Sequence, residues 1–183
     1  MSKRILVPIA DGTEEIEAVC IIDVLRRAGA EVTVASVDQL QVTASRGVKL
    51  VADKQISQCV NEDYDLVALP GGIPGAEHLR DSEALTGILK RQYEAGRLYG
   101  AICASPAVVL EHHGLLASRH ATCHPAFVEL IERTDEIESR VVVDGPCITS
   151  RGAGTAIEFV LKLVEQLYGE EKAEEVALAM VVN

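Results

Sequence analysis

Two hydrophobic patterns alternate along the chain. Continuous apolar runs of strand length are followed by segments with a helical period, beginning with 4–10, 14–29 and 31–37 and continuing with 64–72 and 82–96. Runs that are apolar at every position indicate strands covered on both faces, and their alternation with helices indicates parallel pairing through right-handed crossovers. The pattern therefore predicts an α/β fold with a mostly parallel central sheet.

Later segments continue this alternation. A short break at 41–52, with two strand-like runs around a turn at 45–47, predicts a small β excursion. No repeat, linker or low-complexity segment interrupts the chain, so we predict one domain over 1–183. The later elements that we expect are strands at 98–102, near His120, at 140–145 and at 147–150, and helices at 105–113, 155–167 and 171–180.

Composition and charge disfavour several classes of partner and site. The 28 acidic and 17 basic residues give a net charge of -11, which disfavours nucleic acid and anionic membrane surfaces as partners. The chain opens with MSKR and enters a strand directly, so we expect a cytoplasmic protein. The five cysteines are odd in number and lack a C-x-x-C pair, which argues against a disulfide framework. No triplet of ligand residues has metal-site spacing, and we predict neither metal nor cofactor.

In open α/β sheets the ligand crevice lies outside the carboxyl ends of the strands. Functional residues are therefore expected directly after strands. Four places qualify, namely 11–17, 70–72, Cys103 and 123–125.

Cys103 stands where an apolar strand is expected to turn into a helix beginning near Ser105. The free N–H groups and the dipole of a helix N-terminus favour a thiolate, and cysteines placed in this way titrate at roughly 3.5 to 7.5. The pattern thus predicts a nucleophile at a strand-to-helix elbow. The alternative is a small buried packing residue.

Gly71 and Gly72 follow another strand and bring backbone N–H groups close to a bound group. The Gly72 amide and the amide of Ala104, directly after the cysteine, would form an oxyanion site. Read alone, the Pro-Gly-Gly sequence is only a turn.

Glu17 lies one turn into the first predicted helix, on the face that also carries Cys20 and Val24. A carboxyl buried beside a thiolate is expected to stay protonated and to donate a hydrogen bond to sulfur, because desolvation and like charge raise its pKa. It would then tune the thiol and not deprotonate it. Glu14 and Glu15 need no role beyond favouring the helix dipole.

His124 is a candidate general acid or base, since imidazole titrates near neutral pH and its loop abuts the crevice. The alternative is an ordinary loop residue before Pro125. The neighbouring Cys123 is either a packing residue or a second oxidisable thiol. His112 and His113 suit the C-terminus of the helix after Cys103.

Several stretches together resemble the ThiJ/PfpI superfamily, in its branch of the Parkinsonism-associated protein deglycase and the bacterial ThiJ-type chaperone. The resemblance covers essentially the full length. It is carried by EEIEAV, ASRGV, YDLVALPGG with the following GAE, AICASPAVVL, the Thr-x-His-Pro pattern at 122–125, and TSRGAGTAIEF.

The resemblance implies a flavodoxin-like three-layer sandwich, a homodimer, and a nucleophilic cysteine at Cys103. It further implies a protonated glutamate at Glu17, amides at Gly72 and Ala104, and an auxiliary histidine at His124. Arg46 matches an arginine near a dimer-proximal pocket of the family, with a solvated turn residue as the equally weighted alternative.

Departures from the wider superfamily also inform function. The protease-like branch has His directly after the nucleophile, where this chain has Ala104. Amidotransferases have Glu at the second position after their His, where Ala126 stands here. Ala153 replaces the usual Pro of TSRGPGT. Proteolysis and amidotransfer are therefore disfavoured, and nothing supports thiazole biosynthesis.

The leading hypothesis is a cofactor-free glyoxalase or protein deglycase, acting on methylglyoxal-type dicarbonyls or on their early adducts with protein and other amines. The rival is a redox-responsive chaperone or stress sensor that works through oxidation of Cys103. A third possibility is a non-catalytic α/β binding domain.

Overall fold

Seven strands form the central sheet in the order β5-β2-β1-β6-β7-β9-β8. The computed structural model describes residues 2–182. Every neighbouring pair is parallel except β8 with β9. The strands are β1 (Arg4–Ile9), β2 (Glu31–Ser36), β5 (Lys54–Gln55), β6 (Leu66–Leu69), β7 (Leu98–Ile102), β8 (Val141–Asp144) and β9 (Cys147–Ser150).

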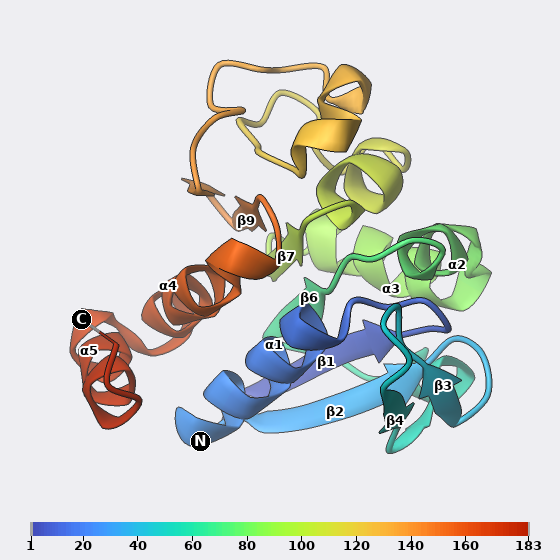
Figure 1. The fold of residues 1–183 in the computed structure, drawn as a ribbon, viewed down its shortest axis with the longest axis horizontal. Helices are drawn as coiled ribbons and strands as arrows, with labels where there is room; N and C mark the ends of the chain where they lie inside the picture. The colour runs from blue at the N-terminus through green and yellow to red at the C-terminus, as the bar shows by residue number, and fades with distance from the viewer. Residues whose placement is uncertain (1, 183) are drawn as a thin grey trace.

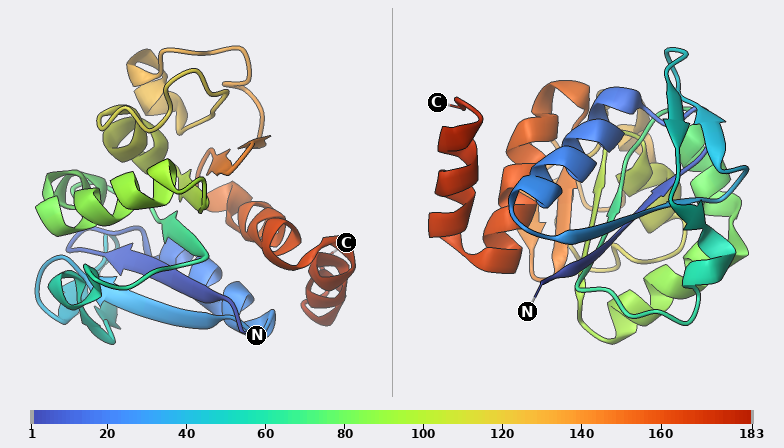
Figure 2. Two further views of the ribbon diagram at one scale, coloured as in Figure 1. Left: turned by 180° about the vertical axis from the view of Figure 1, so that it is seen from behind. Right: turned by 90° about the horizontal axis from the view of Figure 1, so that it is seen from below.

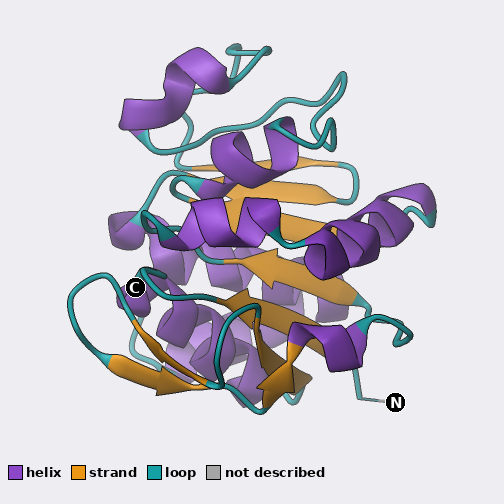
Figure 3. Ribbon diagram, turned by 90° about the vertical axis from the view of Figure 1, so that its right-hand side faces the viewer, coloured by secondary structure: helices purple, strands orange, loops and turns teal. Residues whose placement is uncertain are grey.

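Helices cover both faces of this sheet (Figures 1 and 2). One face carries α1 (Glu15–Arg27), α4 (Ala156–Tyr168) and α5 (Glu170–Ala179). The other carries α2 (Gly75–Asp81), α3 (Glu83–Glu94) and a π-helix, η2 (Pro106–Glu111). Figure 3 shows the strands lying between the two helical layers. The predicted flavodoxin-like sandwich with a mostly parallel sheet is confirmed.

β6 shows why continuous apolar runs accompany such a sheet. All four of its side chains are buried. Leu66 and Ala68 join the core beneath α1 and α4, whereas Val67 and Leu69 join the core beneath α2 and α3. Because alternate side chains of a strand point to opposite faces, a strand covered on both sides needs an apolar residue at every position.

The β excursion at 41–52 is confirmed as an antiparallel hairpin of β3 (Gln41–Thr43) and β4 (Lys49–Val51). The expected strand near His120 is wrong, because residues 119–124 are irregular. Side chains take up backbone N–H groups there: His120 N donates to Asp144 Oδ2 at 2.8 Å, and Thr122 N donates to Thr149 Oγ1 at 3.0 Å.

Three short elements complete the fold: the 3-10 turns η1 (Ile56–Cys59), η3 (Pro125–Leu130) and η4 (Ala153–Thr155). The sequence pattern gave no indication of α2, β5 or η1. Across residues 2–182, every helix is too short or too polar to cross a membrane.

Candidate functional site

Cys103 directly follows β7, whose neighbours in the sheet are β6 and β9. Its φ of +65° lies in the left-handed region that residues with a Cβ seldom adopt. Two backbone hydrogen bonds hold it there: Cys103 N donates to Ser150 O at 3.0 Å, and Cys103 O accepts from His124 N at 2.8 Å. Strained conformations of this kind cluster at functional sites, and this one leaves the thiol half-buried.

Glu17 comes from α1 and is fully buried. Its Oε2 accepts a hydrogen bond from Gly71 N at 2.7 Å, while Oε1 has no hydrogen-bond partner among the described residues. Burial raises the pKa of Glu17 to about 7, against the lowering effects of the Gly71 amide and the Cys103 side chain. A carboxyl with a pKa near neutrality can hold or release a proton at physiological pH.

The pKa of the Cys103 thiol differs from the value expected from the sequence. Burial, followed by the Glu17 carboxylate, raises the pKa of Cys103 to about 12, and the amides of Gly72 and Ala104 only partly offset this. The expected lowering of the thiol pKa by a helix N-terminus is therefore wrong while Glu17 is ionised. Desolvation and a like charge outweigh the backbone dipoles.

Glu17 and Cys103 consequently titrate as a pair. The first proton leaves the pair near pH 7, because that is where Glu17 ionises. With the carboxyl neutral, its Coulombic penalty on the sulfur disappears and its O–H becomes a donor. With one proton, the pair holds either a thiol beside a carboxylate or a thiolate beside a neutral carboxyl.

Gly71 allows the loop after β6 to touch Cys103. A Cβ added at Gly71 would lie 2.6 Å from Cys103 Cβ and 2.9 Å from Ile102 O. Gly72 has a φ of +91°, and a Cβ there would lie 2.5 Å from both Glu14 N and Gly12 O. No other residue type fits either position without moving backbone.

The structure brings the two expected amides to one place. The N–H groups of Gly72 and Ala104 both favour a negative charge at the Cys103 sulfur. They come from different loops, one after β6 and one after β7. Such convergent amides are the components of an oxyanion site.

His124 lies beside the elbow through its backbone bond to Cys103 O. Its ring Nδ1 accepts from Ala126 N at 3.2 Å, so the neutral ring carries its proton on Nε2. A neutral His124 is therefore a proton donor at Nε2. None of the hydrogen bonds within residues 2–182 joins this ring to Cys103 or Glu17.

Arg46 lies in the turn between β3 and β4, and its side chain is exposed. Its backbone N donates to Glu15 Oε1 at 2.8 Å, and Ser45 Oγ donates to Glu15 Oε2 at 2.8 Å. Glu15 thus fastens the hairpin to the start of α1, a role beyond the helix dipole. Glu14 accepts from Ile16 N at 2.8 Å as the N-cap of α1.

The other thiols differ from Cys103 in their surroundings. Cys59, Cys123 and Cys147 are buried, and Cys20 is half-buried on α1. Burial raises the pKa of Cys123 to about 11. Within the described part of the chain no cluster of three or more His, Cys, Asp or Glu side chains is arranged to hold a metal ion.

Sequence reasoning missed Ser105. This fully buried residue donates its hydroxyl to Pro70 O at 2.5 Å, across the gap between the ends of β7 and β6. The signal available was a serine at the start of a helix, which ordinarily indicates an N-cap.

Comparison with known proteins establishes the family of this chain. A sequence profile described as the DJ-1/PfpI family matches residues 3–166. The chain belongs to the DJ-1/PfpI family. The resemblance to the ThiJ/PfpI superfamily is thereby confirmed.

Relatives in this family are similar over nearly the whole chain. Protein DJ-1 homolog B of Arabidopsis thaliana is 53% identical over 180 residues, 98% of this chain. The chain spans only 41% of that relative's own length. Glutathione-independent glyoxalase DJR-1.2 of Caenorhabditis elegans is 39% identical over 173 residues, covering 93% of this chain and 91% of the relative. The solved structure of oxidized Toxoplasma gondii DJ-1 is 53% identical, covers 98% of both chains and superposes with a TM-score of 0.95.

Proposed function

We propose that this DJ-1/PfpI protein is a cofactor-independent glyoxalase or protein deglycase, acting on methylglyoxal-type dicarbonyls or their early adducts with amines. One observation carries the proposal: a strained cysteine and a fully buried carboxyl that titrates near pH 7 interact beneath two convergent amides. A nucleophile, a proton acceptor and an oxyanion site are what addition to an aldehyde requires.

The reaction begins with attack of the Cys103 sulfur on the aldehyde carbon. The C–S bond forms as Glu17 takes the thiol proton, and the carbonyl electron pair moves onto oxygen. The oxygen is held by the Gly72 and Ala104 amides and takes the proton from Glu17, which is thereby ionised again, giving a hemithioacetal. Glu17 therefore acts as the base for the thiol, a role that the sequence-based interpretation had excluded.

An internal redox shift follows. Ionised Glu17 removes the proton from the former aldehyde carbon, the electron pair moves toward the adjacent ketone, and the ketone oxygen takes a proton from His124 to give an enediol. The hydroxyl on the first carbon then returns its proton to His124, while Glu17 gives its proton to the second carbon. The first carbon is oxidised to a thioester and the second is reduced to an alcohol, so no external oxidant or reductant is needed. Water then adds to the thioester, the C–S bond breaks, and methylglyoxal leaves as lactate.

His124 is the second proton carrier in this scheme. Because Nδ1 accepts from Ala126 N, the neutral ring carries its proton on Nε2, and in our scheme this N–H donates to the ketone oxygen as charge develops there. The relative DJR-1.2, named a glutathione-independent glyoxalase, supports the same reaction class for this chain.

The decisive experiment measures methylglyoxal loss and lactate formation without glutathione. We expect no turnover by Cys103→Ala. Glu17→Gln should lower kcat about 100-fold to 10,000-fold, the usual contribution of a positioned proton carrier. Cys20→Ala removes another half-buried thiol and is the matched control. We expect it to stay within about twofold of the intact protein, because the Cys20 side chain makes no hydrogen bond to Cys103 or Glu17 among the described residues. Turnover by Cys103→Ala at the intact rate would overturn the proposal.

The second candidate is a redox-responsive chaperone or stress sensor. Cys103 is half-buried, whereas Cys59, Cys123 and Cys147 are buried, and the amides that favour a thiolate also favour an anionic sulfinate. The related Toxoplasma protein is described in an oxidized form. Peroxide should then add two oxygens to Cys103 selectively and change the aggregation of a client protein. The sensor function is supported if the protein does not turn over dicarbonyls and the effect of peroxide on client aggregation depends on Cys103.

A homodimer accompanies either function in our proposal. Ile16 and Val19 of α1 are 54% and 47% exposed, and Val48, beside the turn that Glu15 fastens to this helix, is 48% exposed. A second copy of the chain would cover these apolar side chains. Sedimentation of the intact protein should show a dimer, and Val19→Asp should weaken it. A monomeric intact protein at micromolar concentration contradicts this part.

A further inference from the structure

We infer that Ser105 is a positioning residue that sets the spacing between the two amides of the oxyanion site; the inference rests on the proposed function. The Ser105 hydroxyl joins the loop that supplies the Ala104 amide to the loop that supplies the Gly72 amide. Its single hydrogen bond, to Pro70 O at 2.5 Å, spans the two.

The Ser105 hydroxyl does not cap the helix, as a serine at a helix start ordinarily does. Ser105 occupies the N-cap position of η2, yet its side chain makes no capping bond. It is fully buried and points to the neighbouring strand end instead. The usual capping advantage of serine therefore does not account for this residue.

The bond lies where the backbone ladder stops. The last paired residues of β6 and β7 are Leu69 and Ala101. Beyond them Pro70 has no N–H to donate, and Cys103 N turns to Ser150 O of β9. The Ser105 side chain supplies a link between the two strand ends where the main chain has ceased to do so.

The loop that Ser105 holds also carries the contacts of Glu17. Gly71 N donates to Glu17 Oε2 at 2.7 Å, and Gly71 O accepts from Glu14 N at 2.9 Å. Residues 70–72 are therefore fixed to α1 on one side and to the elbow on the other. Removing the hydroxyl leaves residues 70–72 with their hydrogen bonds to α1 and to Ala76 N but, within the described residues, with none to the elbow. We therefore expect the loop to move away from Cys103.

The test compares Ser105→Ala with Ser82→Ala. Ser82 caps α3 through Leu85 N, so its replacement removes a serine hydroxyl at a comparable cost in stability. We expect Ser105→Ala to lower kcat for methylglyoxal by roughly tenfold to a hundredfold with little change in KM, because misplaced amides lose contact with the oxyanion. Ser105→Thr, which keeps the hydroxyl, should restore most of the rate.

A second readout does not depend on the proposed substrate. The rate of Cys103 alkylation by iodoacetamide, followed against pH in a background lacking Cys20, should show a shifted midpoint in Ser105→Ala and an unshifted one in Ser82→Ala. A purely structural serine would lower stability without moving that midpoint. Equal midpoints and equal kcat values for the two alanine variants overturn the inference. If the intact protein turns over no dicarbonyl but the midpoint shifts, the proposed reaction fails while the positioning role stands.

If Ser105→Ala does not fold, Ser105→Thr decides by itself. A native midpoint in a folded threonine variant supports the hydroxyl bond, and a displaced midpoint contradicts it.

Discussion

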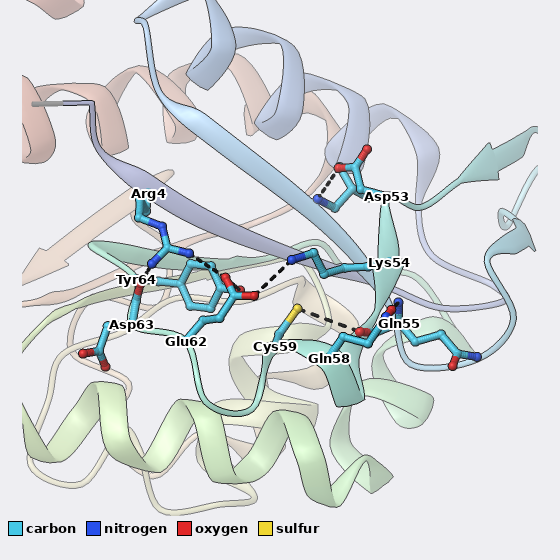
Figure 4. Close-up of polar contacts among 10 residues, drawn as sticks. Arg4, Asp53, Lys54, Gln55, Gln58, Cys59, Glu62, Asp63 and Tyr64 are labelled. Carbon is cyan, nitrogen blue, oxygen red and sulfur yellow. Dashed lines mark hydrogen bonds and ion pairs between the residues drawn. The ribbon is translucent and has the colours of Figure 1, made fainter.

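Two glutamates show how surroundings set the behaviour of a carboxyl in this molecule. Glu17 is buried without a cation, and burial raises its pKa to about 7. Glu62 lies between two cations (Figure 4), 2.5 Å from Arg4 Nη2 and 3.0 Å from Lys54 Nζ. Its hydrogen bond to Lys54 lowers the pKa of Glu62.

The difference separates the region that we propose to be reactive from a structural one. Around Glu62 each charge has a partner, and the Tyr64 hydroxyl also lies 3.3 Å from its Oε2. Around Glu17 one carboxylate oxygen has no hydrogen-bond partner among residues 2–182, and the carboxyl and the Cys103 thiol each shift the pKa of the other. Perturbed, incompletely satisfied groups of this kind mark functional sites more often than saturated ion pairs do.

Among the further changes that test this comparison, the largest effect is expected at Gly71. Gly71→Ala places a methyl group 2.6 Å from Cys103 Cβ, which forces the two loops apart. We expect activity to fall at least about 100-fold, because a displacement near 1 Å has that effect on catalysis. Gly96→Ala is the control. The φ of Gly96 is +65°, but a Cβ added there would meet no atom beyond its chain neighbours within 4 Å. The substitution should therefore cost only about 1 kcal/mol of stability and leave kcat unchanged. Equal activity of the two variants would show that close packing on Cys103 is unimportant.

A smaller effect should separate the two carboxyls by pH. The folded-state pKa of Glu17, about 7, exceeds its ordinary value of 4.5, so the folded protein binds more protons between these values. The contribution of Glu17 to stability therefore falls as pH rises through this window, by roughly 3 kcal/mol in total. Urea unfolding at pH 5 and pH 8 should show this loss in the intact protein and not in Glu17→Gln. Parallel profiles for the two proteins would exclude a raised pKa.

For Glu62, tested by Glu62→Gln, the contribution to stability should depend on pH with the opposite sign. Its folded-state pKa is lowered, so its contribution is present above the ordinary carboxyl pKa and is lost as pH falls. Because Glu62 is partly exposed, we expect less than about 1 kcal/mol at pH 7, and less again in 1 M salt. Dicarbonyl turnover should not change. A loss of turnover would mean that the Glu62 region is coupled to the site.

Much of the site was predictable because parallel strands bring their carboxyl ends together. Cys103, Glu17 and the Gly71–Gly72 turn lie far apart in the chain, yet each follows a strand whose apolar run is plain in the sequence. The burial of Glu17 also followed from helical periodicity, since Val24 on the same face is buried.

What the sequence did not reveal depends on three-dimensional neighbours. The high pKa of Cys103 arises from burial and then from a carboxylate 86 positions away, and neither can be read from a strand-to-helix boundary. Ser105 bonds a carbonyl 35 positions away, whereas local rules make it a cap. The sequence analysis predicts a strand near His120, but long-range side-chain hydrogen bonds fix an irregular path there.

The left-handed backbone conformation at position 103 lowers the stability of the folded protein. A side chain at that angle costs about 1–2 kcal/mol that glycine would not incur. For durability alone, glycine would be the better occupant, and laboratory selection for heat resistance that ignores chemistry should favour it. The sulfur is therefore held against the preference of the fold.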